Sequence, residues 1–381
     1  MLKKCKNDKN LYFVKFLWYL FCLDINKNHK NKDMQAKTNI LLTGASGGVG
    51  YEVLKQLSGL TDIYNITAFD KFSGGTAKLL KPFLKRGINV VFGDITDKDS
   101  IAQVCQNKDV VIHLAALIPP VADEKPDLAY NVNVHGTRNL IQALEQQSPH
   151  AFLLYSSSIS VYGDRISNPY IKVTDPLKPS VGDEYAQTKI KAEKLIECSA
   201  LEWSIFRLTA IMGKHKISKL MFHMPLETPM EICSLEDTGR AFVNAIEKTR
   251  FLRRRIFNLG GGAENRIIYK DFLQRSFTIF GLGKLDFPKH SFADINFHCG
   301  YYADGDELEN ILHFRRDTLE TYFAKVEKNV SGIQRFFTSI FKGIIKKRLF
   351  KESEPYMAIK NNNVGLIKRF FGFKYLKPAK A

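Results

Sequence analysis

The segment NILLTGASGGVG joins an apolar run directly to a turn that contains four glycines. Residues 39–43 predict a strand, and the apolar spacing of residues 49–60 predicts a helix. Gly44 permits the tight turn, Gly47 lets backbone N–H groups approach a phosphate, and Gly50 allows close contact between helix and strand. Because the N-terminus of a helix also carries partial positive charge, this turn predicts a dinucleotide site. The other predicted cofactor contacts in the turn are Ser46, Gly48 and Val49.

Further apolar runs follow at intervals that leave room for a helix between them. They occupy residues 63–69, 88–92, 110–116, 152–155 and 203–208, and a late strand is expected at 255–259 after a helix at 237–247. This alternation predicts an α/β fold, a Rossmann-like doubly wound parallel sheet. Residues 38–323 are expected to form this nucleotide-binding domain, in which 213–235 and 266–323 make a small C-terminal substrate-binding lobe.

The formal net charge of +17 is concentrated at the two ends of the chain. Residues 1–37 contain nine Lys and three Asp, and residues 325–381 contain fourteen Lys or Arg and three Glu. Residues 38–324 contain 33 residues of each sign. A neutral body argues against a nucleic acid partner, whereas basic ends favour contact with an anionic surface or simple solvation.

Residues 1–37 are expected to be a basic extension outside the fold. Their apolar stretch, residues 11–23, contains Lys15 and falls below the roughly 17–25 residues that a spanning helix needs. Met34 is an alternative start, which would leave residues 1–33 untranslated. The six cysteines form no CxxC pair, which favours reduced thiols in the cytoplasm and predicts no metal site.

Asp70 closes the second predicted strand, NITAFD. A carboxylate at this position accepts hydrogen bonds from a ribose diol and repels a 2′-phosphate, which favours NAD over NADP. Lys71 follows directly and would partly accommodate that phosphate, so NADP stays a second possibility.

Several later motifs occur in a fixed order, and together they resemble the extended short-chain dehydrogenase/reductase family, the group that includes sugar-nucleotide epimerases and dehydratases. These motifs are FGDIT, IHLAA, NVNVHGT, YSSSISVYG and EYAQTK. The resemblance implies that Asp94 and Ile95 contact the adenine and that Ala115 and Ala116 lie beside the cofactor. It also implies a structural role for Asn133 and a homodimer. The catalytic residues that it implies are Ser158, Tyr185 and Lys189.

Tyr185 and Lys189 are one helical turn apart, so their side chains share a helix face. A Tyr phenol with an ordinary pKa of about 10 needs a nearby cation to become a base at neutral pH. The resemblance implies that Tyr185 exchanges a proton with the substrate oxygen, that Ser158 hydrogen-bonds this oxygen, and that hydride moves to or from the nicotinamide.

The reaction is less well defined than the site. Dehydratases of this family place an Asp–Glu pair where this chain has Ile159 and Ser160, which argues against a 4,6-dehydratase. The main hypothesis is an epimerase or oxidoreductase that acts on a sugar nucleotide. The segment FRLTAIMG, without the Asn-Pro of hexose-nucleotide 4-epimerases, argues against a UDP-galactose enzyme. The alternatives are a dehydrogenase or reductase of a hydrophobic alcohol or ketone, of hydroxysteroid or flavonol type, and a non-catalytic NAD(P)-sensing scaffold.

Residues 324–381 are expected to form a basic amphipathic tail. From Ile333 to Leu349, apolar residues recur at helical spacing with Lys and Arg between them, and residues 364–377 repeat this aromatic and basic composition. This pattern predicts peripheral attachment of residues 333–377 to an anionic membrane surface. Packing of the helix on the enzyme body or on a second subunit is the alternative.

Overall fold

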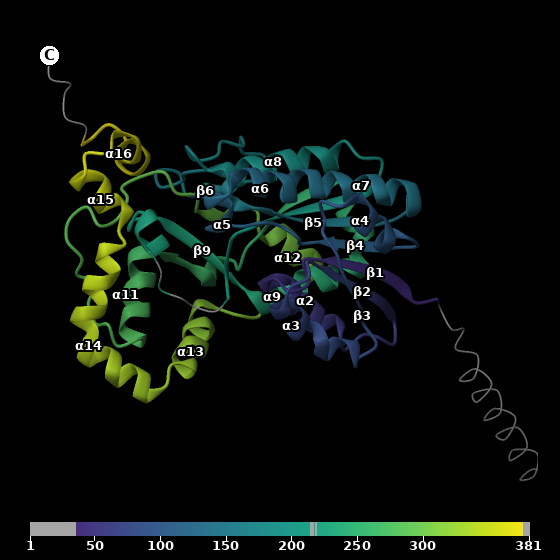
Figure 1. The fold of residues 1–381 in the computed structure, drawn as a ribbon, viewed down its shortest axis with the longest axis horizontal. Coiled ribbons are helices and arrows are strands. Elements are labelled where there is room, and N and C mark those ends of the chain that lie inside the picture. Colours follow the sequence, from purple (N-terminus) through teal and green to yellow (C-terminus); the bar gives the residue numbers. More distant parts are fainter. Residues whose placement is uncertain (1–35, 214–216, 218, 376–381) are drawn as a thin grey trace, which may run out of the picture. The chain divides into compact units, whose positions relative to one another are not determined.

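Seven parallel strands form the central sheet of the computed structural model, which describes residues 36–213, 217 and 219–375 (Figure 1). Their order across the sheet is β10-β7-β5-β4-β1-β2-β3, so the chain winds outward from β1 in both directions. Each strand predicted from an apolar run is present, which confirms the doubly wound fold. The strands are β1 (Thr38–Thr43), β2 (Tyr64–Asp70), β3 (Asn89–Phe92), β4 (Val110–His113), β5 (Phe152–Ser158), β7 (Glu202–Leu208) and β10 (Arg255–Leu259).

Both faces of this sheet are buried, because successive side chains of each strand point to opposite faces. Ile40 and Leu42 enter one hydrophobic cluster with helices α2, α3, α9 and α12, whereas Leu41 enters another with α4, α7 and α8. The helices on the first face are α2 (Gly48–Leu57), α3 (Gly74–Leu84), α9 (Leu235–Ala245) and α12 (Asp306–Leu312). Those on the second face are α4 (Lys98–Cys105), α7 (Gly136–Gln147) and α8 (Glu184–Glu197).

Shorter elements connect these layers. Between β4 and α7 lie α5 (Val121–Glu124), α6 (Pro126–Tyr130) and a π-helical turn (Asn131–His135), and α10 (Thr249–Leu252) precedes β10. Strands β6 (Tyr170–Ile171) and β12 (Tyr301–Tyr302) pair with each other in parallel.

A separate lobe has its own hydrophobic cluster. It contains a small sheet in the order β11-β9-β8, with helices packed around it. Phe272, Phe277 and Phe323 are almost fully buried in its core. The elements are β8 (Ala210–Met212), β9 (Pro229–Ser234), β11 (Arg266–Ile268), α11 (Tyr269–Ile279) and α13 (Leu319–Asn329).

The structure changes two of the predicted domain limits. Helix α12, expected in the lobe, instead buries Leu308 and Leu312 against the cluster beneath the central sheet. The expected boundary between residues 323 and 324 falls inside α13, whose Val326 is buried in the lobe. The spacing of apolar residues predicts where a helix lies, but it does not show against which hydrophobic cluster that helix packs.

The basic tail folds into three helices, α14 (Gly332–Lys351), α15 (Glu354–Lys360) and α16 (Val364–Phe371). The predicted helix from Ile333 to Leu349 is confirmed as α14. Ala358 and Phe370 share a small buried cluster with Ala293 of the lobe, so α15 and α16 are packed elements rather than a free extension.

Residues 1–35 lie outside the described part of the chain, and so do the apolar stretch at 11–23 and the alternative start at Met34. Residues Thr38–Ala381 form one compact unit, separate from Met1–Lys37. Among the described residues, none of the helices combines the length and the apolarity that a membrane span requires.

Candidate active site

The glycine turn between β1 and α2 is shaped by contacts that leave no room for a side chain. Gly44 has a φ of +72°, and a Cβ there would lie 2.6 Å from the backbone nitrogen of Ala115. A Cβ on Gly50 would lie 2.0 Å from the Gly44 carbonyl oxygen. Gly47 is different, because its Cβ would meet only that carbonyl oxygen, at 3.3 Å. Since α2 starts with neither a side-chain cap nor an acidic residue, its positive end can receive an anion such as a pyrophosphate.

The remaining predicted contacts in this turn face different surroundings. The backbone N–H of Ser46 donates to Asp70 Oδ2 at 2.6 Å. A Cβ on Gly48 would contact Leu235 at the start of α9 at 3.4 Å. The side chain of Val49 packs against the hydrophobic cluster, so its backbone is the part available to a phosphate.

Asp70 lies at the end of β2, and Lys71 is already engaged with another carboxylate. Lys71 Nζ donates to Asp94 Oδ2 at 2.7 Å. Burial tends to raise the pKa of Asp94, but hydrogen bonds from Lys71 and Thr96 outweigh it and lower this pKa below its ordinary value. The lysine that would accommodate a 2′-phosphate therefore already has a carboxylate partner.

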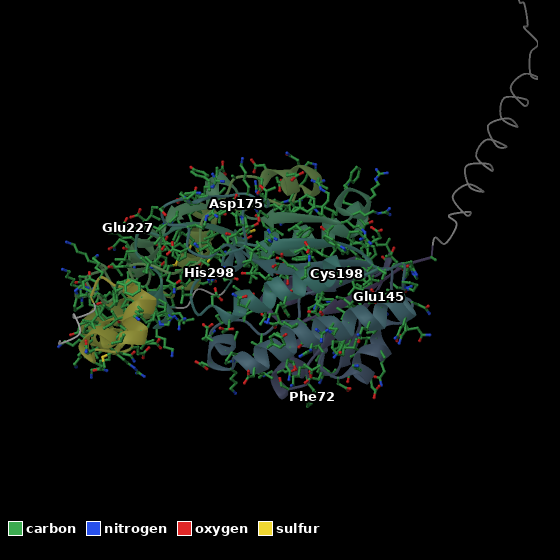
Figure 2. The ribbon with its side chains drawn as sticks, turned by 90° about the horizontal axis from the view of Figure 1, so that it is seen from above. Phe72, Glu145, Asp175, Cys198, Glu227 and His298 are labelled. Carbon is green, nitrogen blue, oxygen red and sulfur yellow. The ribbon has the colours of Figure 1, made fainter. Side chains whose placement is uncertain are left out.

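Phe72 was not identified in the sequence. It follows Asp70 and Lys71, and Figure 2 shows it at the surface of the molecule. Its side chain is 67% exposed. Its ring lies edge-on to that of Phe92, with the centroids 5.5 Å apart. An exposed aromatic ring can stack on a base. The signal available in the sequence was an aromatic residue two positions after the strand-ending Asp.

Ile95, Ala115 and Ala116 occupy two neighbouring loops. Ile95 is only 6% exposed, and its side chain would lie 2.8 Å from a Cβ on Gly136, so it packs under α7. The Ala115 N–H donates to Thr43 Oγ1 at 3.3 Å. Ala115 and Ala116 are half-buried, and Ala115 lies beside the glycine turn. Ile95, by contrast, faces the core.

Asn133 is buried and connects two segments near the site. Its Oδ1 accepts the Leu117 N–H at 2.7 Å, and its Nδ2 donates to the Leu117 carbonyl at 3.0 Å. The same Nδ2 donates to Thr188 Oγ1 on α8 at 2.9 Å. These contacts fix the loop after β4 relative to α8, the helix that carries Tyr185.

Ser158, Tyr185 and Lys189 come together at the carboxyl end of β5. Ser158 is the last residue of this strand, and its side chain lies near enough to the Tyr185 phenol to lower the pKa of that phenol. Lys189 Nζ lies 5.8 Å from the centroid of the Tyr185 ring and donates to the Ser156 carbonyl at 2.8 Å. The edge formed by the carboxyl ends of the strands is where α/β sheets bind their ligands.

Burial dominates the electrostatics of this trio. It raises the pKa of Tyr185 above its ordinary value, although the nearby Ser158 side chain acts in the opposite direction. Burial also lowers the pKa of Lys189 to about 7, against the attraction of Glu193. Both groups are less ionised here than in water, so their proton equilibria respond strongly to any charge that enters the site.

Glu193 and Arg207 form a buried ion pair that was also missed. Arg207 contacts both carboxylate oxygens of Glu193, at 3.0 and 2.7 Å, and Ser157 donates to the same carboxylate. Glu193 follows Lys189 by four residues, so the periodicity of α8 places it on the same face as Tyr185 and Lys189. This spacing was the signal that the sequence offered.

The approach to Tyr185 is mostly apolar. Tyr185 shares a small cluster with Ala122 and Ala129, and Leu117 packs against it. Ile118, in the same loop as Leu117, is 59% exposed.

A cavity of about 520 Å³ opens on the lobe side. Its polar lining includes Ser234, Glu236 and Lys325. One of its residues, Leu235, lies 3.4 Å from the place that a Cβ on Gly48 would take, so the cavity lies near the glycine turn.

Comparison with known proteins agrees with this arrangement. Residues 41–204 match the model of the 3-beta hydroxysteroid dehydrogenase/isomerase family. This match covers less than half of the chain. A 3-beta-hydroxysteroid dehydrogenase from Mycolicibacterium neoaurum is 30% identical to this chain over 163 residues, which are 41% of this chain and 42% of that protein. The chain thus matches less than half the length of this relative.

Solved structures share the fold over a longer stretch of this chain. A dTDP-glucose 4,6-dehydratase from Streptomyces venezuelae, solved with NAD bound, has a TM-score of 0.63 at 20% identity, over 76% of this chain and 96% of that chain. A UDP-glucuronic acid 4-epimerase from Bacillus cereus, in complex with its substrate and NAD, has a TM-score of 0.61 at 20% identity, over 76% and 99%. At these identities the likeness establishes the fold.

Proposed function

We propose that this protein is an NAD-dependent enzyme that transfers hydride at a carbon bearing a hydroxyl or carbonyl oxygen. The observation that carries the proposal is the buried Tyr185, which lies beside Ser158 and shares a helix face with Lys189. Tyr185 exchanges a proton with the substrate oxygen, and Ser158 holds that oxygen in place. Lys189, when protonated, favours the phenolate of Tyr185.

NAD fits the residues on the adenosine side of the site. The uncapped start of α2 would hold the pyrophosphate, the Asp70 carboxylate the adenosine ribose, and the exposed ring of Phe72 the adenine. The ion pair between Lys71 and Asp94 supports NAD over NADP, because it removes the free cation that a 2′-phosphate would need. When bound, NAD supplies the hydride acceptor or donor.

A sugar nucleotide is the first candidate substrate. The dehydratase and the epimerase with similar folds act on such molecules, and the cavity on the lobe side offers polar and charged side chains from Ser234, Glu236 and Lys325. An enzyme that oxidises and re-reduces the same sugar would keep its NAD bound between turnovers.

A hydrophobic secondary alcohol is the second candidate. Two observations favour it, the apolar approach to Tyr185 past Leu117 and Ile118, and the match of residues 41–204 to the hydroxysteroid dehydrogenase family. Such an enzyme would release reduced NAD after each turnover.

The test begins with mass spectrometry of the nucleotide released from the purified full-length protein. Turnover is then measured with UDP-glucose, UDP-glucuronic acid and a 3-beta-hydroxysteroid, by following nicotinamide absorbance and sugar configuration in parallel. The Tyr185→Phe variant should retain NAD and lose about 10²–10⁴-fold in kcat, because it keeps the ring and removes the proton donor.

Tyr130→Phe is the matched control. Tyr130 lies at the end of α6, where Lys191 lies over its ring, and its loss of a hydroxyl should leave turnover unchanged. Equal activity of Tyr185→Phe and wild type on every substrate that turns over would refute the assignment of Tyr185. NAD binding without turnover of any of them would favour a sensing role.

A further inference from the structure

Helix α14 carries a continuous apolar stripe that no other part of the described chain covers. Six large apolar side chains on it are between 49% and 73% exposed, and their spacing of 3, 4, 7, 8 and 11 residues from the first places them on one helix face. We call this set the α14 stripe. It consists of Ile333, Phe336, Phe337, Ile340, Phe341 and Ile344.

The opposite side of α14 is anchored to the lobe. Ile345 and Leu349 pack against the hydrophobic cluster of the lobe, and Lys346 forms an ion pair with Asp286 and donates to the Lys284 carbonyl at 2.7 Å. Figure 1 shows α14 at the outer edge of the lobe, farther from the central sheet than α11. The helix is therefore held in one orientation with the α14 stripe facing outward.

The charges of α14 all have one sign. The helix contains six basic residues and no acidic residue. Three of them, Lys347, Arg348 and Lys351, follow Ile333 by 14, 15 and 18 residues, which continues the same face beyond its apolar part. The exposed face thus consists of an apolar patch followed by a cationic cluster.

We propose that the α14 stripe docks in the headgroup region of a bilayer that contains anionic lipids. Phenylalanine and isoleucine side chains enter the boundary between headgroups and acyl chains, and Lys347, Arg348 and Lys351 lie against lipid phosphates or carboxylates. Helix α14 then lies flat on the surface, because its other side is fixed to the lobe.

The charge pattern decides between a lipid surface and a second copy of this chain. Two copies joined through the α14 stripe would bring two helices without acidic residues together, and their basic clusters would repel each other or remain unpaired. An anionic surface instead neutralises these charges while it covers the apolar patch. The surface proposed here is narrower than residues 333–377, because Ile367, Phe370 and Phe371 of α16 are already buried.

The test is co-sedimentation of the full-length protein with vesicles of phosphatidylcholine alone and of phosphatidylcholine mixed with phosphatidylserine. Wild type should pellet with the mixed vesicles, and added salt should weaken this binding. A Phe337→Ser/Ile340→Ser variant should lower the partition coefficient about 100-fold, because it removes two apolar side chains from the interface. A Lys347→Gln/Arg348→Gln/Lys351→Gln variant should lower it at least about tenfold on mixed vesicles and little on neutral ones.

A triple Lys-to-Gln variant of α3 matches the charge change at another exposed site. Lys78, Lys81 and Lys85 are exposed on α3 or at its end, and their replacement should leave vesicle binding as in wild type. Unchanged thermal unfolding of all variants would show that the folded structure is kept, which the exposure of the substituted side chains leads us to expect.

Three results would overturn the proposal. They are the absence of wild-type binding to mixed vesicles, binding that survives both α14 variants, and a dimer in sedimentation velocity that dissociates in the Phe337→Ser/Ile340→Ser variant without any vesicle binding. The last result would assign the α14 stripe to a second copy of the chain. None of these readouts requires turnover, so the proposed enzymatic function stands or falls separately.

Discussion

Replacement of Lys189 by methionine tests the electrostatic basis of the site. Lys189 is 2% exposed, and burial lowers its pKa from 10.5 to about 7. Methionine, like lysine, has a long, unbranched side chain, but it carries no titratable group. The variant therefore removes the titration of this group and keeps most of its packing.

The expected effect has a defined sign and size. Between pH 7 and 10.5 the unfolded chain keeps the Lys189 proton, whereas the folded protein has released it. Because the unfolded state binds more protons, raising the pH in this window stabilises the folded state, and the gain is lost again as the pH falls toward 7. At 1.36 kcal/mol per pH unit, the contribution of Lys189 grows by about 4 kcal/mol between about pH 7 and pH 10.

The assay is urea unfolding of wild type and of Lys189→Met at a series of pH values. The difference between the two free energies of unfolding should change by about 4 kcal/mol over this range, in favour of wild type at high pH. Lys194→Met is the control on the same helix, because 74% of the Lys194 side chain is exposed, and its profile should run parallel to that of wild type. A constant difference between wild type and Lys189→Met would refute the lowered pKa of Lys189.

Three further predictions concern the surroundings of the site. Glu193→Gln removes the charge that pairs with the buried Arg207, and it should lower the free energy of unfolding by about 3–5 kcal/mol in urea titrations. Gly44→Ala should abolish NAD binding in calorimetry, because the new Cβ would lie 2.6 Å from Ala115 N at a φ of +72°. Phe72→Ala should weaken NAD binding by about 1–3 kcal/mol without a change in the free energy of unfolding. An unchanged Kd would show that the adenine does not stack on this ring.

The sequence predicts the central sheet well, because each of its strands is a short apolar run that must be buried on both faces. Residues 255–259 show this best, since they form β10 at the sheet edge after a long excursion into the lobe. The lobe is harder to predict. Its strands β8, β9 and β11 are three to six residues long, and their pairing depends on residues far apart in the chain. Periodicity within one segment carries no information about such partners.

The candidate site also divides into a part that the sequence predicts and a part that it does not. Ser158, Tyr185 and Lys189 are brought together by a strand end and a single helix, and that local geometry is readable in the sequence. The contacts of Lys71 with Asp94 and of Glu193 with Arg207 depend on tertiary structure, because the partners are 23 and 14 residues apart in different elements. Residue types alone could not indicate that Lys71 pairs with Asp94.

Buried hydrogen bonds connect the glycine turn to the helix that carries Tyr185. Thr43, the residue before Gly44, contacts His113 Nδ1 at 2.8 Å, and His113 Nε2 contacts Thr137 at 2.9 Å. Burial lowers the pKa of His113 to about 3, so its ring is neutral and carries one proton. Thr137 already donates its hydroxyl proton to the Asn133 carbonyl, so the His113 proton must lie on Nε2 and Thr43 must donate to Nδ1.

The series of hydrogen bonds, each with a fixed donor, continues into α8. Asn133 donates to Thr188 Oγ1, and Thr188 donates to the Tyr185 carbonyl at 2.7 Å. Each hydroxyl in this series therefore has one fixed donor role, and none can rotate without leaving a buried acceptor unsatisfied. The turn that would hold the pyrophosphate and the helix turn that presents the Tyr185 phenol are thereby fixed relative to each other. This gives a physical reason for the predicted structural role of Asn133, whose hydrogen bonds hold the loop after β4 and the Tyr185 turn of α8 in a fixed relation.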